Sequence, residues 1–316
     1  MNLEQIGLLR CPRCRGALEG AGAPLEGVSC SCCGKEYRIE RRALRLAGSV
    51  GDYTESFGRQ WNRYDVARPA EDAAVFRVKT GVSALALAGQ RVLDAGCGGG
   101  RYARLAAESG AHVIGIDLSR AVDKAAELCA PYPDALIVQA DLLNLPVAQG
   151  AFDLVYSIGV LHHTPAPRVA FAQIARCVRP GGRLSVWLYR RNTPPQEWIN
   201  SALRHLAGRL PPRVLENLCA GLAVLGGVPV LNKTLNKIVN FSNHPDWTLR
   251  VCDNFDWYAP PFQSHHTVDE LKGWFHEEGF VDLEELAPEK SGSVYDWAHH
   301  HNLIIGGGVN VTGARR

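Results

Sequence analysis

Short apolar runs alternate with helix-like patterns through the middle of the chain, and this alternation limits the fold more than any other feature of the sequence. Strands are expected at 91–94, 111–117, 135–138, 152–157 and 182–189, and helices at about 100–109, 119–129 and 167–178. Strands that are joined by single helices pair in parallel, because each helix returns the chain to the end of the sheet at which the previous strand began. The sequence therefore predicts an α/β fold with helices on both faces of a parallel sheet.

The residues around this core differ from it in composition. A chain of 316 residues, 46% of them hydrophobic, is long enough for one large α/β domain and an appendage. We expect five segments: a small cysteine-rich domain at 1–48, an N-terminal helical segment at 49–90, the core at 91–190, a helical and aromatic insertion at 191–262, and the completion of the core sheet at 263–316.

The first expected strand ends in a glycine-rich loop, Asp94-Ala95-Gly96-Cys97-Gly98-Gly99-Gly100, which leads into a helix. Glycines there let the backbone turn sharply and let a ligand approach the main chain. A dinucleotide fingerprint needs a third glycine where this chain has Arg101 or, counted from Gly98, Ala103, so the loop alone does not identify the nucleotide. Asp94 discriminates better, because a carboxylate would repel a pyrophosphate but would accept the ammonium group of an amino acid.

Two further carboxylates follow the next strands. Asp117 closes the second strand, where a carboxylate accepts the hydroxyls of a ribose, and Asp141 follows the third, where it is placed to accept from an adenine amino group. Together with the loop and with segments 152–155 and 179–182, they resemble in order the motifs of class I S-adenosylmethionine-dependent methyltransferases. The resemblance covers about residues 90–190.

This resemblance implies a Rossmann-like, seven-stranded sheet whose last strand is reversed, and segments 280–284 and 302–305 fit the final hairpin. It also implies S-adenosylmethionine as the cofactor and a lid over the active site in the 191–262 insertion. The residues expected to bind the cofactor are Asp94, Gly96, Cys97, Gly98, Gly100, Asp117, Leu118, Asp141, Leu142 and Ser157.

Five of the ten cysteines lie between positions 11 and 33, in a CxxC…CxxC pattern. Two such turns present four thiolates in a tetrahedron, which suits a structural Zn²⁺ with no open position for catalysis. Cys32 competes with its neighbours as a ligand, but the spacing of Cys30 and Cys33 repeats that of Cys11 and Cys14, which favours these four. The segment resembles the zinc ribbon of the small activator subunit of tRNA and protein methyltransferases.

Methyl transfer to a hydroxyl group needs a base, and three histidines are candidates for catalysis. His162 follows the fourth strand at the ligand-binding edge of the sheet, and His265 and His266 precede a helix expected at 268–278, with Thr267 as its N-cap. Packing or capping is the alternative role for His162. The run His299-His300-His301 is expected to form a turn and not a metal site, since adjacent side chains do not share one face of a strand.

Aromatic and polar residues outside these motifs are candidates for contact with the substrate. The alternative is that the aromatic side chains only dock the insertion on the core. The apolar helical pattern near 196–240 has two interpretations as well, a lid or a helix pair that packs or forms a homodimer. The predicted substrate residues are Trp61, Tyr64, His163, Trp257, Tyr258 and Gln263.

The leading interpretation is a methyltransferase that acts on a small molecule at O, N or C, such as a specialised metabolite, a lipid or a sugar. One alternative is an RNA or protein methyltransferase that uses the ribbon for recognition; another is a non-catalytic zinc-ribbon binding protein. A net charge of +2 argues against nucleic acid, and residues 157–160 lack the Asn/Asp-Pro-Pro-Tyr/Phe string of enzymes that methylate amide nitrogens. Without an apolar run of spanning length or a signal peptide, the chain is expected to be cytoplasmic.

Overall fold

The computed structural model describes residues 3–21, 26–48, 58, 69–191, 193–228, 235, 238–286 and 308–316. Its centre is a parallel sheet formed by strands β5 (Arg91–Ala95), β6 (His112–Asp117), β7 (Ala135–Gln139), β8 (Phe152–Ile158) and β9 (Val178–Tyr189). These strands confirm the five expected from the sequence, although β9 begins four residues earlier than the expected 182. Parallel pairing follows from the helical crossovers between the strands.

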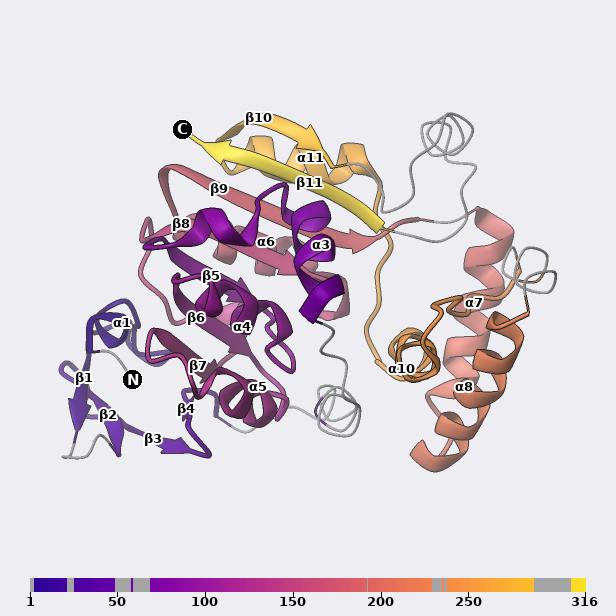
Figure 1. Ribbon diagram of the computed structural model, residues 1–316, viewed down its shortest axis with the longest axis horizontal. Helices are drawn as coiled ribbons and strands as arrows, with labels where there is room; N and C mark the ends of the chain where they lie inside the picture. Colours follow the sequence, from indigo (N-terminus) through magenta and orange to yellow (C-terminus); the bar gives the residue numbers. More distant parts are fainter. Residues whose placement is uncertain are drawn as a thin grey trace.

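An antiparallel strand completes this sheet. Strand β11 (Gly308–Arg315) lies between β9 and β10 (Phe280–Glu285) and runs opposite to both, with Val311 opposite Val186 of β9. The resulting order, β7-β6-β5-β8-β9-β11-β10, has the reversed strand of the expected seven-stranded sheet (Figure 1). The segment 302–305, expected to form this strand, lies outside the described residues, as does the histidine triplet at 299–301.

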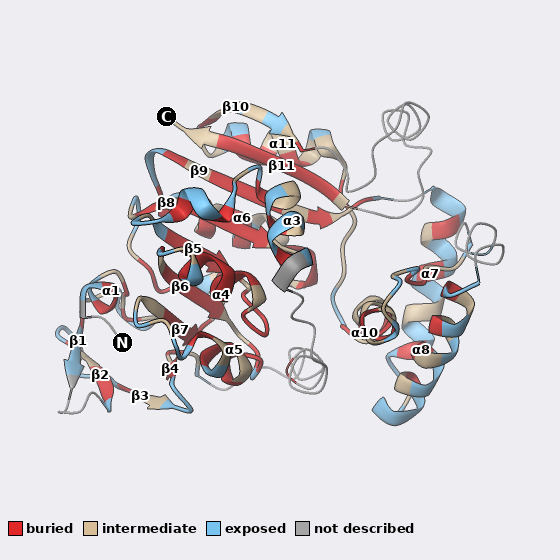
Figure 2. Ribbon diagram, in the orientation of Figure 1, coloured by how far each residue is buried: buried red, intermediate tan, exposed pale blue. Residues whose placement is uncertain are grey.

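Helices cover both faces of the sheet because successive strand residues point to opposite sides. On one face, Val92 and Tyr156 pack with helices α3 (Pro69–Thr80), α4 (Arg101–Glu108) and α5 (Val122–Cys129). On the other, Leu93 and Val155 pack with α6 (Pro167–Cys177) and α11 (Val268–Glu277). Figure 2 shows the central strands mostly buried between these two layers. Both faces being apolar explains why the strands read as nearly continuous hydrophobic runs.

The cysteine-rich domain extends the same sheet at its other edge. After helix α1 (Leu3–Gly7), strands β1 (Leu18–Ala21), β2 (Gly27–Cys30), β3 (Glu36–Glu40) and β4 (Ala43–Arg45) pair in antiparallel order. Strand β4 then pairs in parallel with β7, with Leu44 opposite Val138 and Arg45 opposite Gln139. The domain therefore covers the backbone edge of β7, which would otherwise be open.

The insertion forms a helical cap beyond the end of β9 (Figure 1). Helices α7 (Pro194–Ala207) and α8 (Pro212–Gly226) confirm the expected helical pattern near 196–240. A third helix, α10 (Trp247–Tyr258), packs Phe255 and Tyr258 against Leu215 and Cys219 of α8. It ends just before Pro260-Pro261, as expected of residues that cannot continue a helix. Among the described residues, every helix is too short or too polar to cross a membrane.

Candidate functional site

The glycine-rich loop is fixed to the end of the neighbouring strand. The backbone N–H groups of Gly96 and Cys97 both donate to the carbonyl of Ile116, at 2.7 and 2.9 Å. Gly96 has a φ of 93°, and a Cβ atom there would lie 2.3 Å from Cγ2 of Val160, so only glycine fits this turn. Gly100 then begins helix α4 as its N-cap. The loop is thus pressed against the segment that follows β8.

Asp94 is the first residue of this loop and is 3% exposed. Its Oδ2 atom is buried and has no hydrogen-bond partner among the described residues. Burial, which penalises the charged form, raises the pKa of Asp94 to about 7, while the Tyr156 hydroxyl opposes the rise and the charge of Asp117 adds to it. A buried carboxylate without a cation is costly, so the site is suited to a ligand that brings a positive charge.

Asp117 at the end of β6 holds the loop from the other side. Its Oδ2 accepts the N–H of Gly98 at 2.9 Å, and its Oδ1 accepts the N–H and the hydroxyl of Ser119 at 2.8 and 2.7 Å. Burial raises its pKa despite these bonds. A carboxylate has about four acceptor positions, so Asp117 retains capacity for a ligand hydroxyl.

The remaining predicted cofactor residues line the same edge of the sheet in different ways. Asp141 follows β7, and its Oδ1 caps the short helix η3 (Leu142–Asn144) by accepting the N–H of Leu143 at 2.8 Å. The hydroxyl of Ser157 is buried and donates to the carbonyl of Ala95 at 2.8 Å, so it joins β8 to β5. Cys97 and Leu142 are buried, whereas Leu118 is half-buried.

His162 lies in short helix η4 (Leu161–His163) after β8 and has no exposed surface. Its ring stacks on Tyr189 with centroids 3.9 Å apart, and neither ring nitrogen has a hydrogen-bond partner among the described residues. Burial first, and then the nearby His163, hold the pKa of His162 well below its ordinary value. The imidazole is therefore neutral and has nitrogen atoms to offer to a ligand.

Two residues that the sequence analysis did not select join this cluster to the cap. Tyr189 ends strand β9, and its hydroxyl donates to Oδ2 of Asp256 in α10 at 2.7 Å. Nε2 of His163 lies 3.5 Å from the same oxygen, and Nδ1 of His163 lies 3.1 Å from the carbonyl oxygen of Phe262. Tyr189 could have been predicted as a site residue, because it lies at the carboxyl end of a parallel strand. No local feature of the sequence indicates Asp256.

His265 and His266 point in different directions and have different partners. Nδ1 of His265 lies 2.6 Å from a carboxylate oxygen of Glu197 in α7, and its Nε2 lies 3.0 Å from the amide nitrogen of Gln263. His266 is buried between Glu270, at 3.0 Å from Nδ1, and Ser264, at 2.8 Å from Nε2. Burial lowers the pKa of His266. Both nitrogens of His266 are engaged, so it stabilises the start of α11.

The other predicted substrate residues lie mainly in the cap. Tyr258 is buried and donates its hydroxyl to the carbonyl of Asn240 at 2.6 Å, and Trp257 packs against the same apolar cluster of the cap. Their aromatic rings thus pack within the cap itself. Trp61 and Tyr64 lie outside the described residues.

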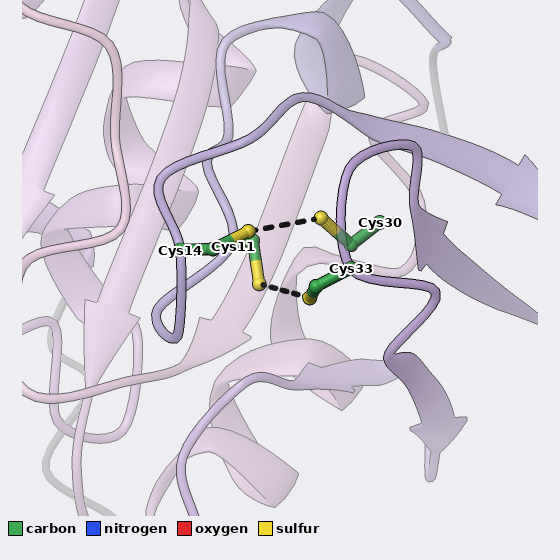
Figure 3. A group of neighbouring side chains, drawn as sticks. All are labelled: Cys11, Cys14, Cys30 and Cys33. Carbon is green, nitrogen blue, oxygen red and sulfur yellow. Dashed lines mark hydrogen bonds between the residues drawn. The ribbon is translucent and has the colours of Figure 1, made fainter.

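The four predicted metal ligands meet at one point. The sulfur atoms of Cys11, Cys14, Cys30 and Cys33 all lie within 4.8 Å of one another, with 3.7 Å between Cys11 and Cys33 and 3.4 Å between Cys14 and Cys30 (Figure 3). Thiolates around one Zn²⁺ are about 3.8 Å apart, given a Zn–S bond of about 2.3 Å and tetrahedral geometry. The donor set therefore fits zinc.

The two cysteine turns have the same backbone geometry, which explains why Cys32 is excluded. In each turn the first cysteine accepts an N–H from the residue after the second, Arg15 at 2.8 Å or Gly34 at 3.0 Å. Both of these residues have a positive φ, 64° and 67°. Cys32 falls at the third position of its turn and is exposed. A Cβ on Gly16 would lie 2.7 Å from that of Cys32 and 3.1 Å from the sulfur of Cys30, so glycine is required beside the cluster.

Comparison with known proteins agrees with this geometry. Residues 93–186 match the family model described as "Methyltransferase domain". The chain is 33% identical over 150 residues to a ubiquinone biosynthesis O-methyltransferase of Thiobacillus denitrificans, covering 46% of this chain and 64% of that protein. It is 34% identical over 144 residues to the protein of the same name from Dechloromonas aromatica, covering 45% and 61%. The chain thus spans less than two thirds of the length of these relatives.

Two solved structures resemble the fold at low sequence identity. One is an S-adenosylmethionine-dependent methyltransferase from Mesorhizobium loti, with a TM-score of 0.44 and 22% identity, covering 72% of this chain and 92% of that one. The other is phosphoethanolamine N-methyltransferase 2 of Haemonchus contortus in complex with S-adenosyl-L-methionine, with a TM-score of 0.47 and 16% identity, covering 82% and 56%.

Proposed function

We propose that this chain, whose residues 93–186 match the methyltransferase domain family, is a class I S-adenosylmethionine-dependent methyltransferase that transfers a methyl group to a small-molecule acceptor. The observation that carries the proposal is the buried Asp94 carboxylate beside the glycine loop, one oxygen of which has no partner among the described residues. The cofactor carries an ammonium group and an electrophilic methyl on a sulfonium. A cation of this kind would offset the cost of burying Asp94.

The loop and the residues after the next two strands would each bind a different part of the cofactor. Asp94 would accept the ammonium group, Asp117 the ribose hydroxyls, and Asp141 with Leu142 the adenine. Gly96 lets the ligand approach the main chain because no Cβ fits there. These carboxylates lie at the carboxyl ends of adjacent strands β5, β6 and β7, where open α/β sheets bind their ligands.

Oxygen is the acceptor atom that we propose, and the names of the relatives, O-methyltransferases, support it. In such a transfer the acceptor oxygen attacks the methyl carbon in line with the breaking C–S bond, and the hydroxyl proton passes to a base. His162 is our base, because its ring is neutral and both of its nitrogens lack a protein partner among the described residues. His265, oriented by Glu197, is the second candidate; His266 has no nitrogen to spare.

Calorimetry with S-adenosylmethionine tests the first step, and a protein that binds none of it would contradict the proposal. Transfer of labelled methyl groups to a panel of phenols, catechols and aliphatic alcohols then identifies the acceptor. His162 and His265 are replaced singly by Ala. The variant that lacks the base should lose turnover about 10²-fold or more and should retain its affinity for the cofactor. Full turnover in both variants would refute the base assignment.

Zinc is part of the proposal as a structural ion held by the four cysteines, and metal analysis should find about one zinc ion per chain. All ten cysteines are free, which favours a reducing, cytoplasmic location. The comparisons give no support to a ribbon that recognises RNA or protein. A homodimer through the cap helices stays a prediction, motivated by exposed apolar residues such as Trp198, Leu206 and Leu218, and light scattering tests it.

A further inference from the structure

A cavity of about 230 Å³ opens between the cap and the core. It lies between helix α7 and the segment that precedes α11, next to the end of β9. Every residue that lines it has a polar or charged side chain, which is unusual for a pocket that holds a small molecule. The lining residues are Arg191, Glu197, Asn200, Ser201, Arg204, Gln263 and His265.

Arg204 is the cation of this cavity that lacks a carboxylate partner. Its guanidinium donates to the carbonyls of Trp257 and Pro260, at 2.6 and 2.8 Å, and forms no ion pair within the described part of the chain. Burial lowers the pKa of Arg204, while the nearby Tyr189 and Asp256 oppose this shift. A guanidinium held by two backbone carbonyls keeps further N–H donors for a planar anion.

The other charges of the cavity are largely compensated. Arg191 pairs with Glu270 at 2.9 Å, and Glu197 is bound to His265 at 2.6 Å. Gln263 adds a buried Oε1 atom without a hydrogen-bond partner in the described residues. The remaining imbalance is therefore positive and lies at Arg204, with Asn200 and Ser201 beside it as neutral hydrogen-bonding groups.

A continuous series of contacts joins the cavity to the cofactor loop. The ring of His265 lies 6.1 Å from that of Tyr189, which stacks on His162 at 3.9 Å. His162 follows Val160, the residue pressed against Gly96. A series of aromatic rings thus connects the cavity to the loop, and such rings favour contact with a flat ligand.

We propose that this cavity binds the carboxylate of the methyl acceptor through Arg204, so that the acceptor is a small hydroxylated aromatic acid. This inference rests on the proposed methyltransferase function. The carboxylate end would lie at Arg204 and the ring beside Tyr189, which leaves the hydroxyl group near His162. Arg204 is then a specificity residue that selects acids over neutral analogues of the same shape.

Calorimetry with three probes tests the inference: 3,4-dihydroxybenzoate, its methyl ester and catechol, each with the cofactor-loaded protein. We expect the acid to bind about tenfold more tightly than the ester, because a charge-assisted pair is lost in the ester. In Arg204→Gln this preference should fall to about twofold. Arg209→Gln, an exposed residue at the end of the same region, is the matched control and should keep the full preference.

Arg204 also holds the cap together, so a second variant guards against misfolding. Ser201→Asp places a negative charge at an exposed position of the cavity and should abolish the preference for the acid while leaving catechol binding intact. Equal binding of acid and ester to the wild type, or an undiminished preference in both variants, would overturn the inference. Loss of cofactor binding would instead refute the proposed function, and the acid–ester comparison without cofactor would still decide the cavity's role.

Discussion

The hydroxyl of Tyr189, the last residue of strand β9, donates a 2.7 Å hydrogen bond to the carboxylate of Asp256 in cap helix α10. This bond connects the cap to the strand ends at which the acceptor is expected. Burial first, and then the nearby Asp256 carboxylate, raise the pKa of Tyr189 well above its ordinary value. The tyrosine therefore remains the donor at every physiological pH. The bond between Glu197 and His265 also joins the cap to this region, so the Tyr189–Asp256 pair is one of the contacts that hold the cap there.

Replacing Tyr189 by Phe should loosen the cap without emptying the cofactor site. We expect a loss of about 1–3 kcal/mol in the free energy of unfolding, because the charged Asp256 carboxylate loses the hydrogen bond that the Tyr189 hydroxyl donates. The Michaelis constant for the acceptor should rise several-fold while the cofactor dissociation constant stays unchanged. Urea unfolding and steady-state kinetics measure these effects. Tyr132→Phe, at a partly buried tyrosine that follows helix α5, is the control, and an equal effect there would contradict the role of the bond.

Asp94 should make cofactor binding depend on pH. Its pKa of about 7 means that the carboxylate is protonated below neutrality, when it no longer attracts an ammonium group. Affinity for S-adenosylmethionine should therefore rise from pH 6 to pH 8. Calorimetry across this range checks the expectation, and a flat profile would argue against contact between Asp94 and the ammonium group.

The same carboxylate should destabilise the ligand-free protein. A raised pKa in the folded state contributes stability that is present below pH 3.8, the ordinary pKa, and is lost as the pH rises through about 7. Asp94→Asn removes the charge, so at pH 8 it should raise stability by at most about 4 kcal/mol while weakening cofactor binding. Thermal unfolding at pH 5 and pH 8 tests this, since the gain should be smaller at pH 5 and should vanish only below the ordinary pKa of 3.8.

Removal of zinc should unfold the ribbon, because four thiolates brought together without a metal have little else to hold them. A chelator should lower the melting temperature of the wild type, and Cys14→Ser should lower the zinc content from about one ion per chain toward zero. Cys32→Ser supplies the control, since Cys32 lies outside the cluster. Zinc loss in the Cys32 variant, with retention in the Cys14 variant, would reverse the ligand assignment.

Arg45 of strand β4 should couple the ribbon to the cofactor edge. It forms an ion pair with the buried Asp123 and donates to Gln139 at 3.1 Å, whose amide in turn donates to the carbonyl of Leu118 at 2.9 Å. Arg45→Ala should cost about 3 kcal/mol of stability because it leaves Asp123 poorly paired. It should also weaken cofactor binding.

Arg41 offers a matched comparison for Arg45. It pairs with the same Asp123 carboxylate but its side chain is 72% exposed, against 13% for Arg45. Exposed pairs contribute about 0–1 kcal/mol, so Arg41→Ala should have little effect on unfolding by urea. Equal losses in the two variants would show that burial of the pair is not the cause.

Local features of the sequence predicted the core correctly. Strand period, helix length and the glycine loop are set by neighbours along the chain, so β5 to β9 and the turn at Gly96 were found where expected. The cysteine spacing was informative for the same reason, since Cys30 and Cys33 repeat the turn of Cys11 and Cys14. The N-cap of α11, where Thr267 accepts the N–H of Glu270, is likewise a local signal.

By itself, then, the sequence determined the strands of the central sheet, the glycine loop and the four cysteines that cluster, because each is encoded within a few residues. Only the tertiary structure decided that Tyr189 meets Asp256 across 67 positions, that β4 continues the sheet beside β7, and that Arg204 faces a cavity with His265. It also separated the histidines, giving His266 two partners and His162 none among the described residues. Such contacts depend on how distant segments pack, and neither periodicity nor spacing records the packing of distant segments.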